Sequence, residues 1–374
     1  MKTTDRKSRI DRLAEWLTEH KINAAVFQDS EDSRDSNITY LTGHPNEALL
    51  FVFDSGKTVL VPWDVAMAEK TAEVDEIVPY NSYRKQIHLA LPGVLDLNGF
   101  GSGKGKVMEL SEKTTHLNFK AIQSAMPSLG LLCREDGVGN FISEMRKIKS
   151  EEEIEIYDKA CALTDQIIEG IERQLKDGKI KTEIDIAMYI ERISRELGGE
   201  GPSFEIIAAG PQRSFGIHAV PSYTAESLTE KGLSIIDFGM KYRGYCTDVT
   251  IGIARGPLTE KQKVMTELIL KIYDKSLAIM KPGNPVKEIA VNAENILNSA
   301  GYSLDHALGH GIGLDVHETP ILRTRDASFL QPGMVIALEP GVYDAKAGGI
   351  RMENDILITD EGHKVLTNSR IIYL

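Results

Sequence analysis

Two aspartates could form an acidic pair in the middle of the chain. Asp237 and Asp248 lie in the segment 233–253, whose β-branched and aromatic flanks predict a β-hairpin. A turn centred between Tyr242 and Arg243 would make the two aspartates direct cross-strand partners, with Cβ atoms about 5 Å apart. Like charges that close are destabilising unless a cation lies between them. The pair alone therefore fits a metal site about as well as an arrangement in which one or both aspartates point to solvent.

Two glutamates also stand in strand-like sequence. Glu339 directly follows the apolar residues 334–338, and Glu353 lies in the strand-like stretch 350–358. Because side chains alternate along a strand, Arg351 and Glu353 are expected on the same face. A glutamate that ends an apolar strand is not typical of a solvated charge.

Histidines are concentrated in one glycine-rich stretch. His306, His310 and His317 fall within twelve residues, although the whole chain has only nine histidines. A lone histidine is usually structural, but this density beside glycines that allow close approach favours metal ligation or proton transfer.

Together these residues form a set that could hold two divalent metal ions: Asp237, Asp248, His310, Glu339 and Glu353. Four carboxylates neutralise two such ions. An oxygen-rich set with one nitrogen and no thiolate favours manganese, cobalt or iron(II) over a structural zinc site. Two metals about 3.5–4 Å apart are the apparatus of hydrolytic aminopeptidases and phosphatases.

The elements that must position these residues lie in the second part of the chain. Ser150 and Glu153 fit a capping box, so we place a domain boundary just before them and expect domains 1–145 and 146–374. The second domain is predicted to contain helices at 151–175, 182–197, 259–280 and 285–300, and strands at 204–209, 233–238 and 245–254, before a strand-rich end. Helices followed by antiparallel strands predict an α+β fold.

The first part of the chain alternates between the two patterns. We expect a helix at 6–20 and strands at 24–27, 38–41, 49–53 and 58–61, which together predict an α/β domain.

Composition excludes several classes of function. The chain has 374 residues and a net charge of −12, with no basic block, so we expect no nucleic-acid partner. Its three cysteines are too few and too scattered for a disulfide framework or a thiolate metal site. No apolar run is long enough to span a membrane, and we expect a cytoplasmic protein.

The motifs resemble those of the pita-bread metallopeptidases, the family of prolidase, aminopeptidase P, methionine aminopeptidase and creatinase. The stretches that carry the resemblance follow the family's order and spacing over 150–374: 236–239, 244–250, 306–318, 333–343 and 349–353. Residues 36–43 look like the N-terminal domain of the prolidase and aminopeptidase P branch. The resemblance implies an α+β pita-bread catalytic domain. A smaller α/β creatinase-type N-terminal domain would precede it, restrict substrate access and make dimer contacts.

The resemblance also implies roles for single residues. The five residues of the set above match the family's ligands for two divalent ions, with manganese or cobalt expected first and iron(II) or zinc second. His218, His317 and Glu339 match catalytic residues, and His306 and Arg351 match substrate-binding residues. The implied activity is attack by a metal-bridging hydroxide on the bond preceding proline in dipeptides or short peptides. The enzyme would be an Xaa-Pro dipeptidase or Xaa-Pro aminopeptidase, and a homodimer.

Alternatives stay open at this point: a methionine aminopeptidase-like hydrolase, a creatinase-like hydrolase, or a pita-bread protein that only binds partners. The first domain argues against the methionine aminopeptidase branch, and the intact ligand positions argue against the other two. Two departures from the family pattern are Ile217, where proline is frequent, and Ile321, where many prolidases carry an arginine. The second departure favours activity on peptides longer than two residues.

Overall fold

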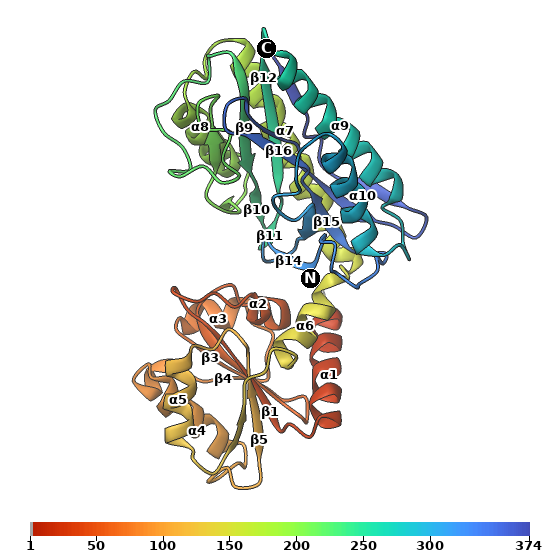
Figure 1. The fold of residues 1–374 in the computed structure, drawn as a ribbon. Coiled ribbons are helices and arrows are strands. Elements are labelled where there is room, and N and C mark those ends of the chain that lie inside the picture. Colours follow the sequence, from red (N-terminus) through yellow and green to blue (C-terminus); the bar gives the residue numbers. More distant parts are fainter. Residues whose placement is uncertain (1–2) are drawn as a thin grey trace. The chain divides into compact units, whose positions relative to one another are not determined.

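The chain divides into two compact units, 1–145 and 146–374. The computed structural model describes residues 3–374, drawn in Figure 1. Within that range, no helix combines the length and the apolar character needed to cross a membrane.

The first unit is a six-stranded sheet with helices. Strand β1 pairs in parallel with β5 and antiparallel with β2, in the order β4-β3-β2-β1-β5-β6. The elements are α1 (Thr3–Glu19), β1 (Ala24–Asp29), α2 (Ser36–Thr42), β2 (Ala48–Phe53), β3 (Thr58–Pro62), α3 (Val65–Thr71), β4 (Glu76–Ile77), the 3-10 helix η1 (Tyr80–Tyr83), α4 (Ile87–Leu97), β5 (Val107–Leu110), α5 (His116–Ala125), β6 (Gly130–Leu132) and α6 (Val138–Lys147). The predicted helix at 6–20 and three of the four predicted strands are confirmed.

The strand predicted at 38–41 is wrong: these residues belong to helix α2. The Asp35 side chain caps the helix by accepting a hydrogen bond from the Asn37 backbone N–H at 3.1 Å. Gly43 ends it in a left-handed conformation with φ 79°. The strand-like composition of this stretch is therefore overridden by helix signals at both ends.

The second unit contains the long helices and most of the strands. Its elements are α7 (Glu151–Lys176), α8 (Glu183–Glu196), β7 (Gly201–Pro202), β8 (Ile207–Ala209), β9 (Gly232–Phe238), β10 (Met240–Tyr242), β11 (Tyr245–Cys246), β12 (Val249–Arg255), α9 (Glu260–Ile279), α10 (Val286–Ser299), β13 (Gly309–Gly311), β14 (Glu318–Ile321), β15 (Val335–Leu338), β16 (Gly341–Asp344), β17 (Gly348–Arg351), β18 (Asn354–Ile358), β19 (His363–Val365) and β20 (Ile371–Tyr373). The four predicted helices are confirmed, as is the capping box of Ser150 and Glu153.

Each pair of long helices covers its own group of strands. One apolar core joins α7 and α8 to β8, β9 and β12, and another joins α9 and α10 to β15 and β18 (Figure 1). Most of the strands form two larger, largely antiparallel sheets, in the orders β20-β12-β9-β8 and β14-β13-β15-β18-β19, and the remaining strands form two small sheets, β11-β10-β7 and β16-β17. Helices segregated onto antiparallel sheets confirm the predicted α+β class.

The hairpin between β9 and β12 turns one residue later than the sequence suggested. Arg243 and Gly244 occupy the turn with φ values of 50° and 83°. Positive φ at both central residues is the geometry of a type I′ turn, whose twist matches that of the flanking strands.

The later turn changes the partner of Asp237. Asp237 pairs with Thr250, so the prediction that Asp237 and Asp248 are direct cross-strand partners is wrong. Asp248 lies two residues before Thr250 and therefore on the same face as Thr250. The two aspartates are diagonal neighbours on one face of the sheet, rather than directly opposed.

Gly239, directly after β9, lies so close to the backbone of Thr247 that it has no room for a side chain. A Cβ atom on Gly239 would lie 1.7 Å from the carbonyl oxygen of Thr247. We expect Gly239→Ala to lower the free energy of unfolding by about 3 kcal/mol, because the backbone must move to relieve the overlap. Urea unfolding followed by circular dichroism measures this, with Gly362→Ala as the control because its added methyl meets nothing within 4 Å. Equal midpoints for both variants would contradict the prediction.

Candidate metal centre and active site

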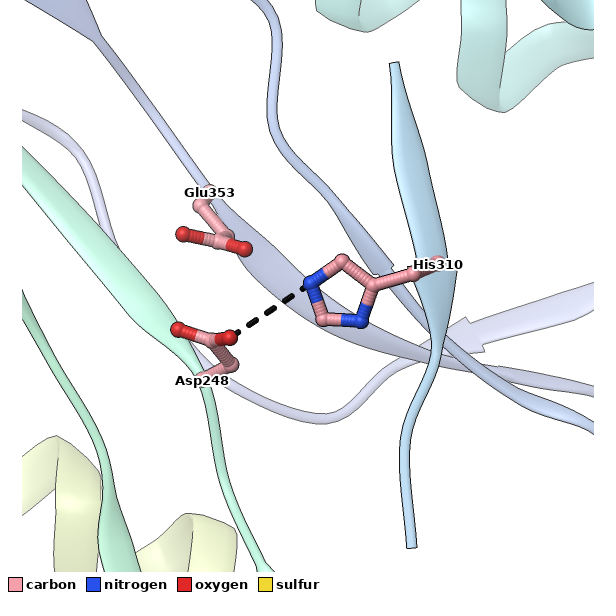
Figure 2. A group of neighbouring side chains, drawn as sticks. All are labelled: Asp248, His310 and Glu353. Carbon is pink, nitrogen blue, oxygen red and sulfur yellow. Dashed lines mark ion pairs between the residues drawn. The ribbon is translucent and has the colours of Figure 1, made fainter. Parts of the chain in front are cut away.

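Three of the five predicted metal ligands form one buried group. Ligand atoms of Asp248, His310 and Glu353 all lie within 4.8 Å of one another. Figure 2 shows their side chains converging from separate segments of the chain, with His310 Nε2 3.5 Å from Asp248 Oδ2. The three residues are at most 4% exposed. Two carboxylates and an imidazole in this arrangement form a small set of potential metal donors.

The other two predicted ligands border this group. Glu339 follows β15, and its Oε1 lies 3.8 Å from His310 Nε2. Asp237, on β9, accepts a hydrogen bond from Arg351 Nη2 at 2.5 Å. Its negative charge contributes to raising the pKa values of Asp248 and Glu353, so all five predicted ligands share one electrostatic environment.

That environment disfavours the charged forms of these groups. Burial, reinforced by neighbouring carboxylates, raises the pKa values of Asp248 and Glu353 well above their usual range. Burial raises the pKa of Glu339 to about 8, with Arg351 opposing and Asp237 adding to the shift. Burial also lowers the pKa of His310 to about 4. Protons or cations must therefore offset the repulsion between the carboxylates.

The donor set fits divalent cations. Among residues 3–374, Asp237 Oδ1 and Asp248 Oδ1 are buried oxygens without a hydrogen-bond partner. An unsatisfied buried carboxylate oxygen is costly, and a cation would satisfy it. The group of Asp248, His310 and Glu353 offers carboxylate oxygens and an imidazole nitrogen as donors and contains no cysteine.

Arg351 and Thr250 connect the strands beneath the carboxylates. Arg351 Nε donates to Thr250 Oγ1 at 3.0 Å, and that hydroxyl donates to Glu353 Oε2 at 2.7 Å. Arg351 Nη1 donates to the Tyr343 hydroxyl at 2.6 Å and to the carbonyl of Ile217 at 3.1 Å. Arg351 is only 1% exposed, so its guanidinium is engaged by the chain itself.

The predicted catalytic and substrate-binding histidines lie around the same centre. The rings of His317 and His310 are 4.5 Å apart between centroids. His306 Nε2 is 3.0 Å from the Tyr343 hydroxyl, and its Nδ1 lies 3.5 Å from Glu339 Oε2.

The charged form of two of these rings is disfavoured. Burial lowers the pKa of His306 to about 4, with Arg351 and His218 adding to the shift. Burial also lowers the pKa of His317, and again His218 adds to the shift. His218 is therefore close enough to act on both of the other rings. Neutral imidazoles can each donate one hydrogen bond and accept another.

A buried ion-pair network fixes the loop that carries His317. The Glu318 side chain is 8% exposed and pairs with Arg146 and with Lys149, whose Nζ lies 3.3 Å from Oε2. Arg146 Nη2 also lies 2.9 Å from Asp315 Oδ2. Burial by itself would raise the pKa of Glu318, but the two cations outweigh it and hold the pKa below its usual value.

Sequence reasoning missed the residues that support the ligands. Thr250 could have been found, because it lies two residues after Asp248 and so on the same strand face. Asp355 Oδ2 accepts a hydrogen bond from the Asp248 backbone N–H at 3.1 Å, and it lies two residues after Glu353 in the same way. The pairing of Glu318 with Arg146 has no local signal, since 172 positions separate them.

Comparisons with known proteins match both units. The family model described as "Metallopeptidase family M24" matches residues 155–360, and "Creatinase/Prolidase N-terminal domain" matches residues 9–148. The chain is 32% identical to an Xaa-Pro dipeptidase of Pyrococcus horikoshii over 370 residues, which cover 96% of this chain and 97% of the relative.

Solved structures show the same fold along nearly the whole chain. An X-Pro aminopeptidase from Thermotoga maritima matches with a TM-score of 0.84 and 26% identity, covering 98% of this chain and 99% of that one. An Xaa-Pro dipeptidase from Bacillus anthracis matches with a TM-score of 0.83 and 26% identity, covering 98% and 100%. The chain therefore belongs to metallopeptidase family M24, and its catalytic pita-bread domain follows a creatinase/prolidase-type N-terminal domain.

Proposed function

We propose that this chain hydrolyses the peptide bond that precedes proline in short peptides. One observation carries the proposal: Asp248, His310 and Glu353 form a buried group of metal donors in the M24 domain. Similarity to an Xaa-Pro dipeptidase and an X-Pro aminopeptidase over nearly the full length supports this specificity rather than that of another M24 branch.

Membership of the family implies divalent metal ions. In the proposed site, two ions are held by Asp237, Asp248, His310, Glu339 and Glu353. The unpartnered oxygens of Asp237 and Asp248 support this assignment. The donor types support manganese or cobalt, with iron(II) or zinc as alternatives. When bound, such ions make water a nucleophile at neutral pH and polarise a carbonyl oxygen.

The remaining chemistry is assigned to protein side chains. Glu339 takes a proton from the attacking water and passes it to the leaving nitrogen of proline, a role supported by its position beside the metal donors, with Oε1 3.8 Å from His310 Nε2. His218 and His317 donate hydrogen bonds to the carbonyl oxygen as negative charge develops on it. The position of the His317 ring, with its centroid 4.5 Å from that of His310, supports its role as a donor at the site.

His306 and Arg351 are assigned to the substrate side. The contact of His306 with the Tyr343 hydroxyl supports a fixed ring beside the proline ring of the substrate. Arg351 is engaged by Thr250, Tyr343 and Asp237, which supports a role in holding the site. Its predicted direct contact with substrate stays a prediction.

One observation favours peptides longer than two residues. Ile321 is the cross-strand partner of His310, so position 321 presents an apolar side chain beside the site. An apolar side chain offers no ion pair to the free carboxylate of a dipeptide. We therefore propose Xaa-Pro aminopeptidase activity as a second candidate beside dipeptidase activity. The expectations of a homodimer, of a cytoplasmic location, and of an N-terminal domain that restricts access and makes dimer contacts stay predictions.

The direct test compares Ala-Pro with Ala-Pro-Ala as substrates. Protein reconstituted with manganese or cobalt should release alanine from at least one of them, measured by chromatography of the products. Cleavage of Ala-Pro alone identifies a dipeptidase, and cleavage of Ala-Pro-Ala alone identifies an aminopeptidase. The matched control is Glu339→Gln, which keeps the shape of the side chain and should abolish turnover. Cleavage of neither peptide by the wild type would reject the proposal.

Metal binding should release protons near neutral pH. At pH 7 the Glu339 carboxyl, with its pKa raised to about 8, is largely protonated without metal, and a bound cation displaces that proton. The apparent metal affinity should therefore rise with pH up to about 8. Isothermal titration calorimetry in two buffers of different ionisation enthalpy measures the release. Glu339→Gln should release fewer protons, and an enthalpy independent of the buffer would contradict the expectation.

A further inference from the structure

The segment that carries His218 is a long loop with little regular structure of its own. It runs between β8 and β9, and residues 210–224 contain no strand or helix. Val220 is 89% exposed and Phe215 is 50% exposed, whereas Ala219 is buried and Tyr223 packs against the apolar core of α7 and α8. Loops of this length without regular structure are usually functional or disordered. Polar contacts hold the loop in addition to this apolar packing.

A single buried carboxylate joins the two ends of this loop. Glu183 lies in the first turn of α8 and is 0% exposed. Its Oε1 accepts a hydrogen bond from the Gly210 backbone N–H at 2.7 Å. Its Oε2 accepts from both the backbone N–H and the hydroxyl of Thr224, each at 2.7 Å. The carboxylate therefore fixes the first and last residues of the loop to the same point.

Arg213 extends this contact into the loop. Its Nη1 pairs with Glu183 Oε2 and lies 3.2 Å from Thr224 Oγ1. Its Nη2 donates to the carbonyl oxygen of Pro221, three residues after His218. Through Arg213, Glu183 is therefore connected both to Thr224, at the end of the loop, and to Pro221, close to His218.

Three further hydrogen bonds hold the stretch that precedes His218. Ser214 Oγ donates to the carbonyl of Leu233 at 2.7 Å and accepts from the Gly349 backbone N–H at 3.0 Å. Arg351 Nη1 donates to the carbonyl of Ile217 at 3.1 Å. The backbone is thus held on both sides of His218, whose side chain is exposed.

We propose that Glu183 is a positioning residue for His218, acting through Arg213 and the ends of the 210–224 loop. A buried carboxylate is costly unless donors satisfy it, and here every described donor to Glu183 belongs to this loop. The structural part of the inference stands on these contacts alone. The catalytic part rests on the proposed function, in which His218 donates to the substrate carbonyl.

A competing explanation is that Glu183 only stabilises α8. An acidic residue in the first turn of a helix interacts favourably with the helix dipole. Asp185 lies in the same turn and accepts from the backbone N–H groups of Lys181 and Thr182 at 3.0 and 2.9 Å. Since these contacts of Asp185 leave the loop untouched, Asp185→Asn is a matched control for the helix.

The structural test measures hydrogen–deuterium exchange in the metal-free protein. Glu183→Gln replaces an acceptor by an amide that cannot accept from all of these donors, and it leaves Arg213 unpaired. We expect exchange across residues 211–223 to quicken about 10-fold or more in Glu183→Gln and to stay unchanged in Asp185→Asn. Unchanged exchange in Glu183→Gln, or equal changes in both variants, would overturn the proposal.

The catalytic test is a double-mutant cycle with His218→Ala, using the peptide that the wild type cleaves. We expect Glu183→Gln to lower kcat about 100-fold in the wild-type background, because a misplaced donor loses its geometry. In the His218→Ala background the same change should alter kcat less than about twofold, since the donor is already absent. An equal loss in both backgrounds, or no loss in the wild-type background, would overturn the proposal.

Two other outcomes are also decisive. If Glu183→Gln does not fold, Thr224→Val removes one hydroxyl donor and keeps the shape of the side chain. The same exchange and kinetic patterns should then follow, with a kcat loss of about 10-fold, and their absence would overturn the proposal. If the wild type cleaves no Xaa-Pro peptide, the proposed function fails, while the exchange measurement still decides whether Glu183 holds the loop.

Discussion

Mutual repulsion among buried carboxylates is the constraint on which the rest of the second unit depends. Asp248, Glu339 and Glu353 have raised pKa values because burial and their negative neighbours oppose ionisation. Arg351 supplies one positive charge beneath them, and its contacts fix Asp237 and the Thr250 hydroxyl. One cation cannot balance this many acids, so the fold holds together a group that only protons or metal ions neutralise fully.

Charges outside this centre are arranged in the opposite way. The ion pairs of Glu183 with Arg213, and of Glu318 with Arg146 and Lys149, leave no uncompensated acid in their networks. Each network holds a loop that carries one of the candidate catalytic histidines. Oppositely charged side chains therefore pair at the edge of the site and hold its loops, whereas the carboxylates that repel one another lie at its centre. Each network depends on all of its partners, because removing one of them leaves a buried charge without a counter-charge.

Local signals explain what could be predicted from the sequence. The capping box at Ser150 and the apolar periodicity of the long helices are each formed by residues that are close together in the sequence. The helices that these signals predicted are confirmed. Residues 38–41 were mispredicted because their β-branched and aromatic side chains resemble a strand, while the decisive caps lie outside that stretch. The hairpin register depends on which two residues adopt positive φ, which composition alone does not determine. The network around Glu318 joins distant segments, so no short pattern reveals it.

The turn at Arg243 and Gly244 has a consequence for how the chain can change in length. The pairing from Asp237 with Thr250 to Tyr242 with Tyr245 continues in a single register. One extra residue in the second half of the hairpin would rotate Asp248 and Thr250 to the opposite face, towards the apolar core beneath α7 and α8. Two extra residues, by contrast, would restore their facing. Only an even change in the length of the hairpin therefore keeps these side chains on the same face. Related chains that keep this centre are expected to differ here by an even number of residues, or to compensate an odd number with a β-bulge.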